Sequence, residues 1–286
     1  MKTVRVLRAS HWLPDDHSVL AHIVSRRRLG DETNPDPRKP KAFPGGPWRR
    51  MSRLARAVAW CCEQLLDDMP RDIPVVWGSA VGELVPTGRF LDKFFESGAA
   101  SPLAFQNSVY NAPVGHLSIA LKLTGPSETI VAGPASATAA LERGLILARR
   151  HGHCLVVAGD DLSEPLREAH RVNGTEAFLG ECVGALLLHT GEEGPEIELV
   201  PGVAPVQGRP VLSRRTRFPG EPEFEPIPGS FAPEESLGLN LSSGMAVLAA
   251  LAKADRVGGA LIERDLQRVQ TARVIFPRQE PTHTRD

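Results

Sequence analysis

The segment that most constrains the fold covers residues 125–150 and predicts a short strand followed directly by a long helix. A strand is expected over residues 128–132, then a tight turn, then a helix over residues 134–150. The strongly polar side chains of this helix lie on one narrow side: Glu142, Arg143, Arg149 and Arg150. Because its other faces are apolar, most of the helix has to be covered by protein. The sequence therefore predicts a helix in the interior of the fold.

The rest of the chain alternates predicted strands with predicted helices. Strands are expected over residues 4–7, 73–78, 154–160, 183–188 and 273–276, and helices over residues 18–28, 87–96 and 242–254. Ser52 is a predicted N-cap, and the helix after it carries one apolar stripe. Residues 31–47 predict a proline-rich loop and residues 201–233 an irregular connection. The alternation, with strands that are continuously apolar, favours a layered α/β fold.

The composition argues against several classes of function. Hydrophobic residues make up 42% of the chain and charged residues 23%, as in an ordinary globular protein. The formal net charge is -1, so no bulk attraction to nucleic acid or to an acidic membrane is expected. Neither a membrane span nor a secretory leader is expected, and the predicted location is cytoplasmic. The cysteines form no CxxC pair and are expected to be buried free thiols: Cys61, Cys62, Cys154 and Cys182.

Two small groups of polar residues have simple explanations. His151, His153 and Cys154 are close in sequence, but no second cluster completes a metal site, so no bound metal is expected. A loose acidic group follows the strand that ends near residue 160, and helix capping and solvation would account for it: Asp160, Asp161 and Glu164.

Six stretches occur in an order and spacing that resemble the thiolase-like condensing enzymes, and in particular the β-ketoacyl synthases. These stretches are residues 49–53, 78–83, 108–119, 125–127, 156–160 and 180–185. The resemblance implies one thiolase-like domain over residues 1–286, a layered α/β sandwich with buried central helices. It implies an N-terminal ketosynthase-like half at 1–190, a shortened C-terminal half at 191–276 and a polar tail at 277–286.

The same resemblance places Pro134 where a β-ketoacyl synthase carries its nucleophilic cysteine. A helix N-terminus stabilises a thiolate, because its unpaired N–H groups and its dipole favour negative charge. Proline has no nucleophile and no N–H, although its fixed φ suits the first position of a helix. The scaffold of the site is therefore expected without its chemistry, and no catalytic residue and no cofactor are predicted.

The two histidine motifs of the condensing enzymes are also absent. Residues 237–244 occupy the neighbourhood of the second motif, but a leucine follows the glycine. The first motif has no counterpart, since the only similar stretch, around His283, lies in the terminal tail. Decarboxylative condensation needs a nucleophile and donors for the developing charge, and this chain lacks both.

The likeness is nearest to the short chain-length-factor subunits of Gram-negative polyene and type II polyketide systems. It implies a catalytically inactive subunit that forms a heterodimer with an active ketosynthase and shapes its acyl tunnel. Acyl carrier protein is a further candidate partner. The implied interface and tunnel-gate residues are Phe105, Val109, Ala112, Pro113 and His116. Ordinary interface packing explains this set about as well as a gate does, and Val109 has the stronger claim because the matched position faces the tunnel in relatives.

Two alternative functions remain open. The first is an independent acyltransferase or thioesterase that uses a serine, for which Ser136 and Ser108 are nearest to the vestigial site. Such a serine needs a histidine base, and His116 is the only histidine on a neighbouring element. The second is a structural homodimer that binds a carrier protein without influencing chemistry.

Overall fold

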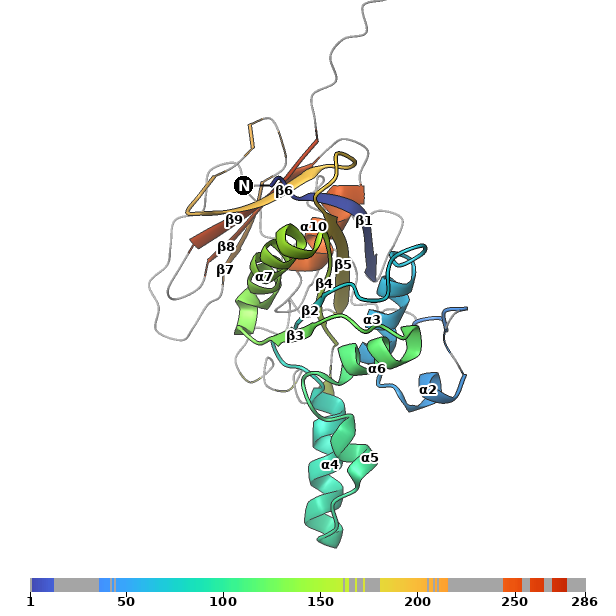
Figure 1. Cartoon of the computed structure of the whole chain (residues 1–286). Coiled ribbons are helices and arrows are strands. Elements are labelled where there is room, and N and C mark those ends of the chain that lie inside the picture. Colours follow the sequence, from blue (N-terminus) through green and yellow to red (C-terminus); the bar gives the residue numbers. More distant parts are fainter. Residues whose placement is uncertain are drawn as a thin grey trace, which may run out of the picture.

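The structure is a computed structural model in which helices pack on both faces of a large set of strands (Figure 1). It describes residues 2–12, 36–41, 43, 45–161, 163–164, 168, 172, 181–204, 206–207, 209, 211–215, 244–253, 258–264 and 269–276. The helix predicted over residues 18–28 and the tail at 277–286 lie outside the described residues.

The described strands follow the order β3-β2-β4-β5-β1-β6-β9-β8-β7 and fall into two blocks. The first block contains β1 (Arg5–Trp12), β2 (Val75–Gly78), β3 (Ser127–Ile130), β4 (His153–Asp160) and β5 (Cys182–His189). The second contains β6 (Glu196–Pro201), β7 (Val211–Arg215), β8 (Gly259–Arg264) and β9 (Val269–Ile275). β2 is parallel to β3 and β4, whereas β5 is antiparallel to β4 and β1. The blocks meet where Arg5 of β1 pairs with Glu196 of β6.

Two helices, α7 (Ser136–His151) and α10 (Gly244–Lys253), form the interior layer. α7 lies on β2 and β4, and α10 contacts β1 and β5 of the first block and β8 and β9 of the second. The residues 244–251 of α10 are all buried, as expected for a helix covered on every side. One hydrophobic cluster joins both blocks through these helices. The predicted interior position of the helix after residue 134 is confirmed.

The opposite face of the first block is covered by α3 (Arg53–Glu63) and α6 (Ala112–Leu121). Successive strand side chains point to opposite faces, so Val75 and Trp77 belong to the cluster under α3 and α6, whereas Val76 belongs to the cluster under α7. This burial on both faces explains why the strands read as continuous apolar runs. The predicted N-cap of α3 is confirmed, because Ser52 Oγ accepts a hydrogen bond from Ala55 N at 2.9 Å.

α7 can approach β4 closely because residue 144 is a glycine. A Cβ at Gly144 would overlap the side chain of Val156 in β4. Any larger residue would push the interior helix away from the strands and open the core between them.

α4 (Leu84–Ser97) and α5 (Pro102–Gln106) project from the rest of the molecule at the bottom of Figure 1. We call residues 84–106 the α4–α5 arm. Neither helix has a buried residue. The two helices contact one another through aromatic rings, since the centroid of Phe90 lies 5.7 Å from that of Phe105. The arm is thus held together by its own aromatic contacts and leaves much apolar surface exposed.

Two segments have more regular structure than the sequence predicts. α2 (Gly45–Arg50) begins inside the predicted loop at 31–47, and β7 lies inside the predicted irregular connection at 201–233. Phe43 is buried and its ring packs edge-on against Trp48, which anchors the start of α2. β7 is a strand because it pairs with β8, about fifty residues later in the chain, and such long-range pairing leaves little trace in local sequence.

Candidate functional site

The turn where the resemblance implies a nucleophile connects β3 to the interior helix α7. It consists of a short 3-10 turn, η1 (Gly133–Ala135), with Gly133 at φ 53°. Only glycine adopts this left-handed conformation without strain, so the sharp reversal before α7 depends on it. Pro134 lies in this 3-10 turn, just before the α-helix starts at Ser136, rather than at the first α-helical position that the sequence predicts.

Ser136 is the first residue of α7, and its hydroxyl group is committed to backbone contacts. It accepts a hydrogen bond from Ala132 N at 3.0 Å and lies 2.6 Å from the carbonyl oxygen of Gly133 and 3.0 Å from that of Ser79. The side chain is fully buried. These contacts fix the turn to the end of β2 and give the hydroxyl group a structural role.

The four cysteines lie outside the turn, are all buried and form no disulfide bond. Cys61 and Cys62 are on α3, Cys154 is on β4 and Cys182 is on β5. Burial raises the pKa of the Cys62 thiol and raises that of Cys154 to about 12. A thiol that stays protonated is a poor nucleophile. Cys62 and Cys154 are therefore poor candidates for the nucleophile that position 134 lacks.

The carboxyl end of β4 organises the loop after β2. Asp160 Oδ1 accepts hydrogen bonds from Ser79 Oγ at 2.5 Å and from Val81 N at 3.0 Å. Asp160 has no exposed surface, and Asp161 is also buried. The explanation of these two carboxyl groups by solvation is therefore wrong. Buried carboxyl groups require such donors, and here the donors come from the adjacent parallel strand end.

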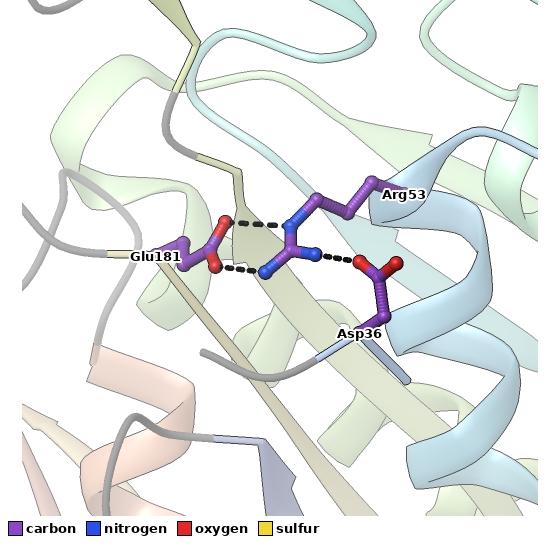
Figure 2. A network of polar contacts seen from close by, with 3 residues as sticks. All are labelled: Asp36, Arg53 and Glu181. Atoms are coloured by element: carbon purple, nitrogen blue, oxygen red, sulfur yellow. Dashed lines mark hydrogen bonds and ion pairs between the residues drawn. The ribbon is translucent and has the colours of Figure 1, made fainter. Parts of the chain in front are cut away.

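Arg53 at the start of α3 connects two acidic residues from distant parts of the chain (Figure 2). Its guanidinium makes a bidentate contact with Glu181, with Nε donating to Oε2 at 3.1 Å and Nη2 donating to Oε1. Nη1 donates to Asp36. The hydrogen bonds to Glu181 raise the pKa of Arg53. This network joins α3 to the start of β5 and fixes the segment that precedes α2.

Two further acids in this region hold their protons unusually strongly. Burial raises the pKa of Glu83 from 4.5 to about 8, although a hydrogen bond from Ser52 Oγ to Oε1 at 2.6 Å opposes the shift. Burial and the charges of Glu181 and Asp160 raise the pKa of Asp161 to about 7. Both carboxyl groups lie near the N-terminus of α3, since Ser52 bonds Glu83 and the charge of Arg53 acts on Asp161.

The predicted gate residues all lie on the segment from α5 to α6, but they differ in exposure. Phe105 on α5 is 56% exposed and Val109, between the helices, is half-buried. Ala112 and Pro113 at the start of α6 are buried within the chain itself. His116 is half-buried; its Nε2 lies 2.8 Å from Asn107 Oδ1, and burial lowers its pKa. The structure therefore leaves Phe105 and Val109 accessible to a partner.

The most exposed apolar residues of the α4–α5 arm are not among the site residues predicted from the sequence. Phe95 is 79% exposed, and Leu91, Phe94 and Leu103 are exposed as well. The sequence did contain a signal for them, because apolar residues recur at helical spacing at positions 90, 91, 94 and 95.

Within the described residues, no three histidine, cysteine or acidic side chains gather in an arrangement that could bind a metal ion. The helices that the structure describes include none with the length and apolar character of a membrane span.

The two strand blocks, the interior helices and the turn before α7 define a thiolase-like α/β fold. The family model for the β-ketoacyl synthase N-terminal domain matches residues 25–199, which is more than half of the chain. The protein therefore belongs to the β-ketoacyl synthase family.

Several solved structures share this fold at low sequence identity. A chain of the ketosynthase (ApeO) in complex with its chain length factor (ApeC) from Xenorhabdus doucetiae is 18% identical, with a TM-score of 0.62 over 96% of this chain and 100% of that chain. A chain of the ishigamide ketosynthase/chain length factor is 14% identical, with a TM-score of 0.64 over 95% of this chain and 99% of that one. A chain of the AntDE:AntF structure, a type II PKS acyl-carrier protein in complex with its ketosynthase, is 15% identical, with a TM-score of 0.68 over 96% of this chain and 98% of that one. A search of the curated proteins finds no match.

Proposed function

We propose that this chain is a catalytically silent ketosynthase-like subunit that pairs with an active β-ketoacyl synthase and shapes its acyl tunnel in polyketide or fatty-acid-like synthesis. The observation that carries the proposal is the turn before α7, which keeps the path from β3 to the helix but holds Pro134 where a nucleophile is needed. A condensing enzyme holds its acyl chain on that nucleophile. The four native thiols are buried on α3, β4 and β5, so none of them occupies this position.

The α4–α5 arm supports the pairing part of the proposal. Five of its large apolar side chains are exposed: Leu91, Phe94, Phe95, Leu103 and Phe105. Complete burial of one such side chain is favourable by about 1.5–3 kcal/mol, so a partner that covers the arm gains substantial free energy. Charges on the arm are balanced between Arg89 and Lys93 on one hand and Asp92 and Glu96 on the other. We therefore assign the arm to an apolar protein interface, and a ketosynthase subunit is the partner that the family suggests.

The gate part of the proposal rests on Phe105 and Val109. They are the two apolar residues among the predicted gate residues that have accessible surface; Phe105 is at the end of the α4–α5 arm and Val109 follows it. Side chains at this point would close the end of the partner's tunnel, and a close-packed wall tolerates little added volume. Ala112 and Pro113 would instead support the wall from within this chain.

The test of the proposal is co-expression with a candidate active ketosynthase from a type II polyketide system. We expect the two chains to purify as a complex, and we expect the double substitution of Phe94→Asp and Phe95→Asp to abolish co-purification. The matched control is Val203→Asp, which changes an exposed valine after β6. A wild-type chain that forms only a stable homodimer in the presence of the ketosynthase would contradict the proposal and favour the structural homodimer.

The serine-enzyme alternative gains no support from the geometry. The Ser136 hydroxyl is buried and bonded to backbone groups, and Ser108 Oγ donates to the carbonyl oxygen of Phe105 at 2.9 Å. His116 pairs with Asn107. Intact-mass measurement after incubation with an acyl thioester decides the matter, since a covalent acyl group on the isolated wild-type chain would contradict the silent-subunit proposal.

A further inference from the structure

The loop that carries Val109 is fixed by hydrogen bonds to several other elements, and we call residues 107–111, between α5 and α6, the gate loop. Its first residue, Asn107, donates through Nδ2 to the carbonyl oxygen of Arg50, the last residue of α2, at 3.0 Å. Because Nδ2 is the donor, Oδ1 accepts, and it lies 2.8 Å from Nε2 of His116 on α6. The start of the gate loop is thus attached to both α2 and α6.

Val109 itself lies between two carbonyl groups that are each contacted by a side chain distant in sequence. Nε1 of Trp77, on β2, donates to the carbonyl oxygen of Tyr110 at 2.9 Å. On the other side of Val109, the hydroxyl group of Thr87, on α4, lies 2.9 Å from the carbonyl oxygen of Ser108. Trp77 is fully buried among the strands, whereas Thr87 belongs to the projecting α4–α5 arm. Val109 is therefore held between the strands and the arm.

The backbone around Val109 has further support. The carbonyl oxygen of Val109 accepts a hydrogen bond from Ala112 N at 2.9 Å, which joins it to the start of α6. The ring of Tyr110 packs so closely on the turn after β2 that a Cβ at Gly82 would lie 2.7 Å from its Cδ1 atom. A loop held in this way keeps the Val109 side chain at one depth, and a close-packed wall depends on such a fixed position.

The hydroxyl group of Thr87 has two acceptors within reach but only one proton to donate. Besides Ser108 O, it lies 2.7 Å from the carbonyl oxygen of Glu83, one helical turn earlier. That carbonyl oxygen already accepts the backbone N–H of Thr87 at 2.9 Å. A proton donated to Ser108 therefore leaves both carbonyl groups with a donor, which favours the contact with the gate loop.

We infer that Thr87 is a positioning residue for the chain-length gate, because its hydroxyl group holds the backbone next to Val109 against the α4–α5 arm. The inference rests on the proposed function, which assigns the gate to Val109 and the arm to the partner interface. A partner that holds α4 also holds Ser108 through Thr87, so binding on the arm acts on the gate. Product length then depends on the hydroxyl group of residue 87 as well as on the size of the side chain at position 109.

The experiment compares Thr87→Val, which replaces the hydroxyl group by a methyl group of similar size, with Thr87→Ser, which keeps the hydroxyl group. Each variant is purified as a complex with the active ketosynthase, and the products formed from an extender thioester are analysed by mass spectrometry. We expect Thr87→Val to raise the ratio of longer products to the main wild-type product by about twofold to tenfold, because loss of one hydrogen bond lets the gate loop retreat. Thr87→Ser should retain the wild-type distribution.

Hydrogen exchange of the peptide over residues 105–112 provides a second measurement that does not need the reaction. Its amides should exchange faster in Thr87→Val, because the gate loop opens locally more often, and at the wild-type rate in Thr87→Ser. The matched control is Thr124→Val. The hydroxyl group of Thr124 lies 3.3 Å from the carbonyl oxygen of Arg71, beyond the C-terminal end of α6, so neither products nor exchange should change.

Unchanged products with Thr87→Val would overturn the inference, whether or not exchange of the gate loop increases. An equal effect of Thr87→Ser would also overturn it, since the hydroxyl group common to serine and threonine would then have no role. If Val109→Phe shortens the products while Thr87→Val leaves them unchanged, the proposed gate stands and the inference falls. If the wild-type chain forms a homodimer and no complex, the proposed function falls, while faster exchange in the Thr87→Val homodimer would support the attachment of the gate loop to the arm.

Discussion

At position 134 this chain has a proline, where the resemblance to the condensing enzymes implies a nucleophilic cysteine. The backbone around it still reverses sharply at Gly133 and starts a buried helix at Ser136. The hydroxyl of Ser136 ties this turn to β2 through Ser79. The turn is thus maintained by contacts that do not involve a nucleophile.

Restoring a thiol at this position tests how much of the site remains. We expect Pro134→Cys to react with iodoacetamide under native conditions faster than the native cysteines, because a thiolate before a helix N-terminus is stabilised. Mass spectrometry of tryptic peptides identifies the alkylated residue. The native cysteines serve as internal controls, since all four are buried. Faster alkylation of any native cysteine than of the new cysteine at position 134 would contradict stabilisation of a thiolate by this turn.

Glu83 predicts a specific pH dependence of stability. Its pKa is about 8 in the folded protein against an ordinary 4.5, so between these values the folded state keeps a proton that the unfolded state has lost. The free energy of unfolding therefore falls as the pH rises through this window. The stabilisation that comes from protonated Glu83 is fully present only below the window. Glu83→Gln removes the carboxyl group but keeps an oxygen acceptor for Ser52 Oγ. We expect the variant to be more stable than wild type by about 2 kcal/mol at about pH 9, with a flatter profile from about pH 5 to about pH 8.

Urea denaturation at several pH values measures this effect. Glu96→Gln is the matched control because Glu96 is exposed on the arm, and its profile should follow the wild type. A Glu83→Gln variant that keeps the wild-type slope would show that another group causes the pH dependence.

At the scale of helices and strands, the segment from α5 to α6 carries the proposed control of chain length. We expect Val109→Phe to shorten the products of the reconstituted complex while leaving the first extension unchanged, because added volume closes the far end of the tunnel only. Product analysis by mass spectrometry gives the chain-length distribution. Val203→Phe provides a control of equal size change on the surface of the second block. Unchanged product length with Val109→Phe would remove residue 109 from the gate.

Local sequence predicted those elements whose character is set by burial alone. The strands near 75, 155 and 185 are apolar along their whole length because they are covered on both faces, and the helix after 134 is polar on one side only. β7 was missed because its pairing with β8 is a long-range contact. The buried carboxyl group of Asp160 was misjudged for a similar reason, since the groups that donate hydrogen bonds to it come from the end of another strand. The order and spacing of several short stretches, rather than any single motif, revealed the family.

At the scale of the whole molecule, the two strand blocks depend on one shared core. The first block lies within residues 1–190 and the second within residues 191–276, so we propose that these ranges are the two halves of one thiolase-like domain. α10 contacts strands of both blocks, and the hydrophobic cluster around it includes residues from each. The halves are therefore expected to unfold together.

Leu248 on α10 provides the test of this shared core. It is fully buried, so Leu248→Ala should lower the free energy of unfolding by about 2–5 kcal/mol. The fluorescence of the tryptophans, all of which precede residue 80, should report the same transition as far-ultraviolet circular dichroism, which reports the whole chain. Ile146→Ala on the exposed side of α7 is the control and should change stability little. Separate transitions for the two probes would show that the halves are independent.

Because of the projecting α4–α5 arm, the proposed function makes the amount of this protein depend on the amount of its partner. In a chain without a bound partner, Phe94 and Phe95 are exposed to water and to other unpaired chains. Such exposure favours aggregation and degradation. Synthesis in excess would then be wasteful, and supply of the partner would set how much of the protein survives. Expression of this chain without a partner should therefore yield mostly insoluble material.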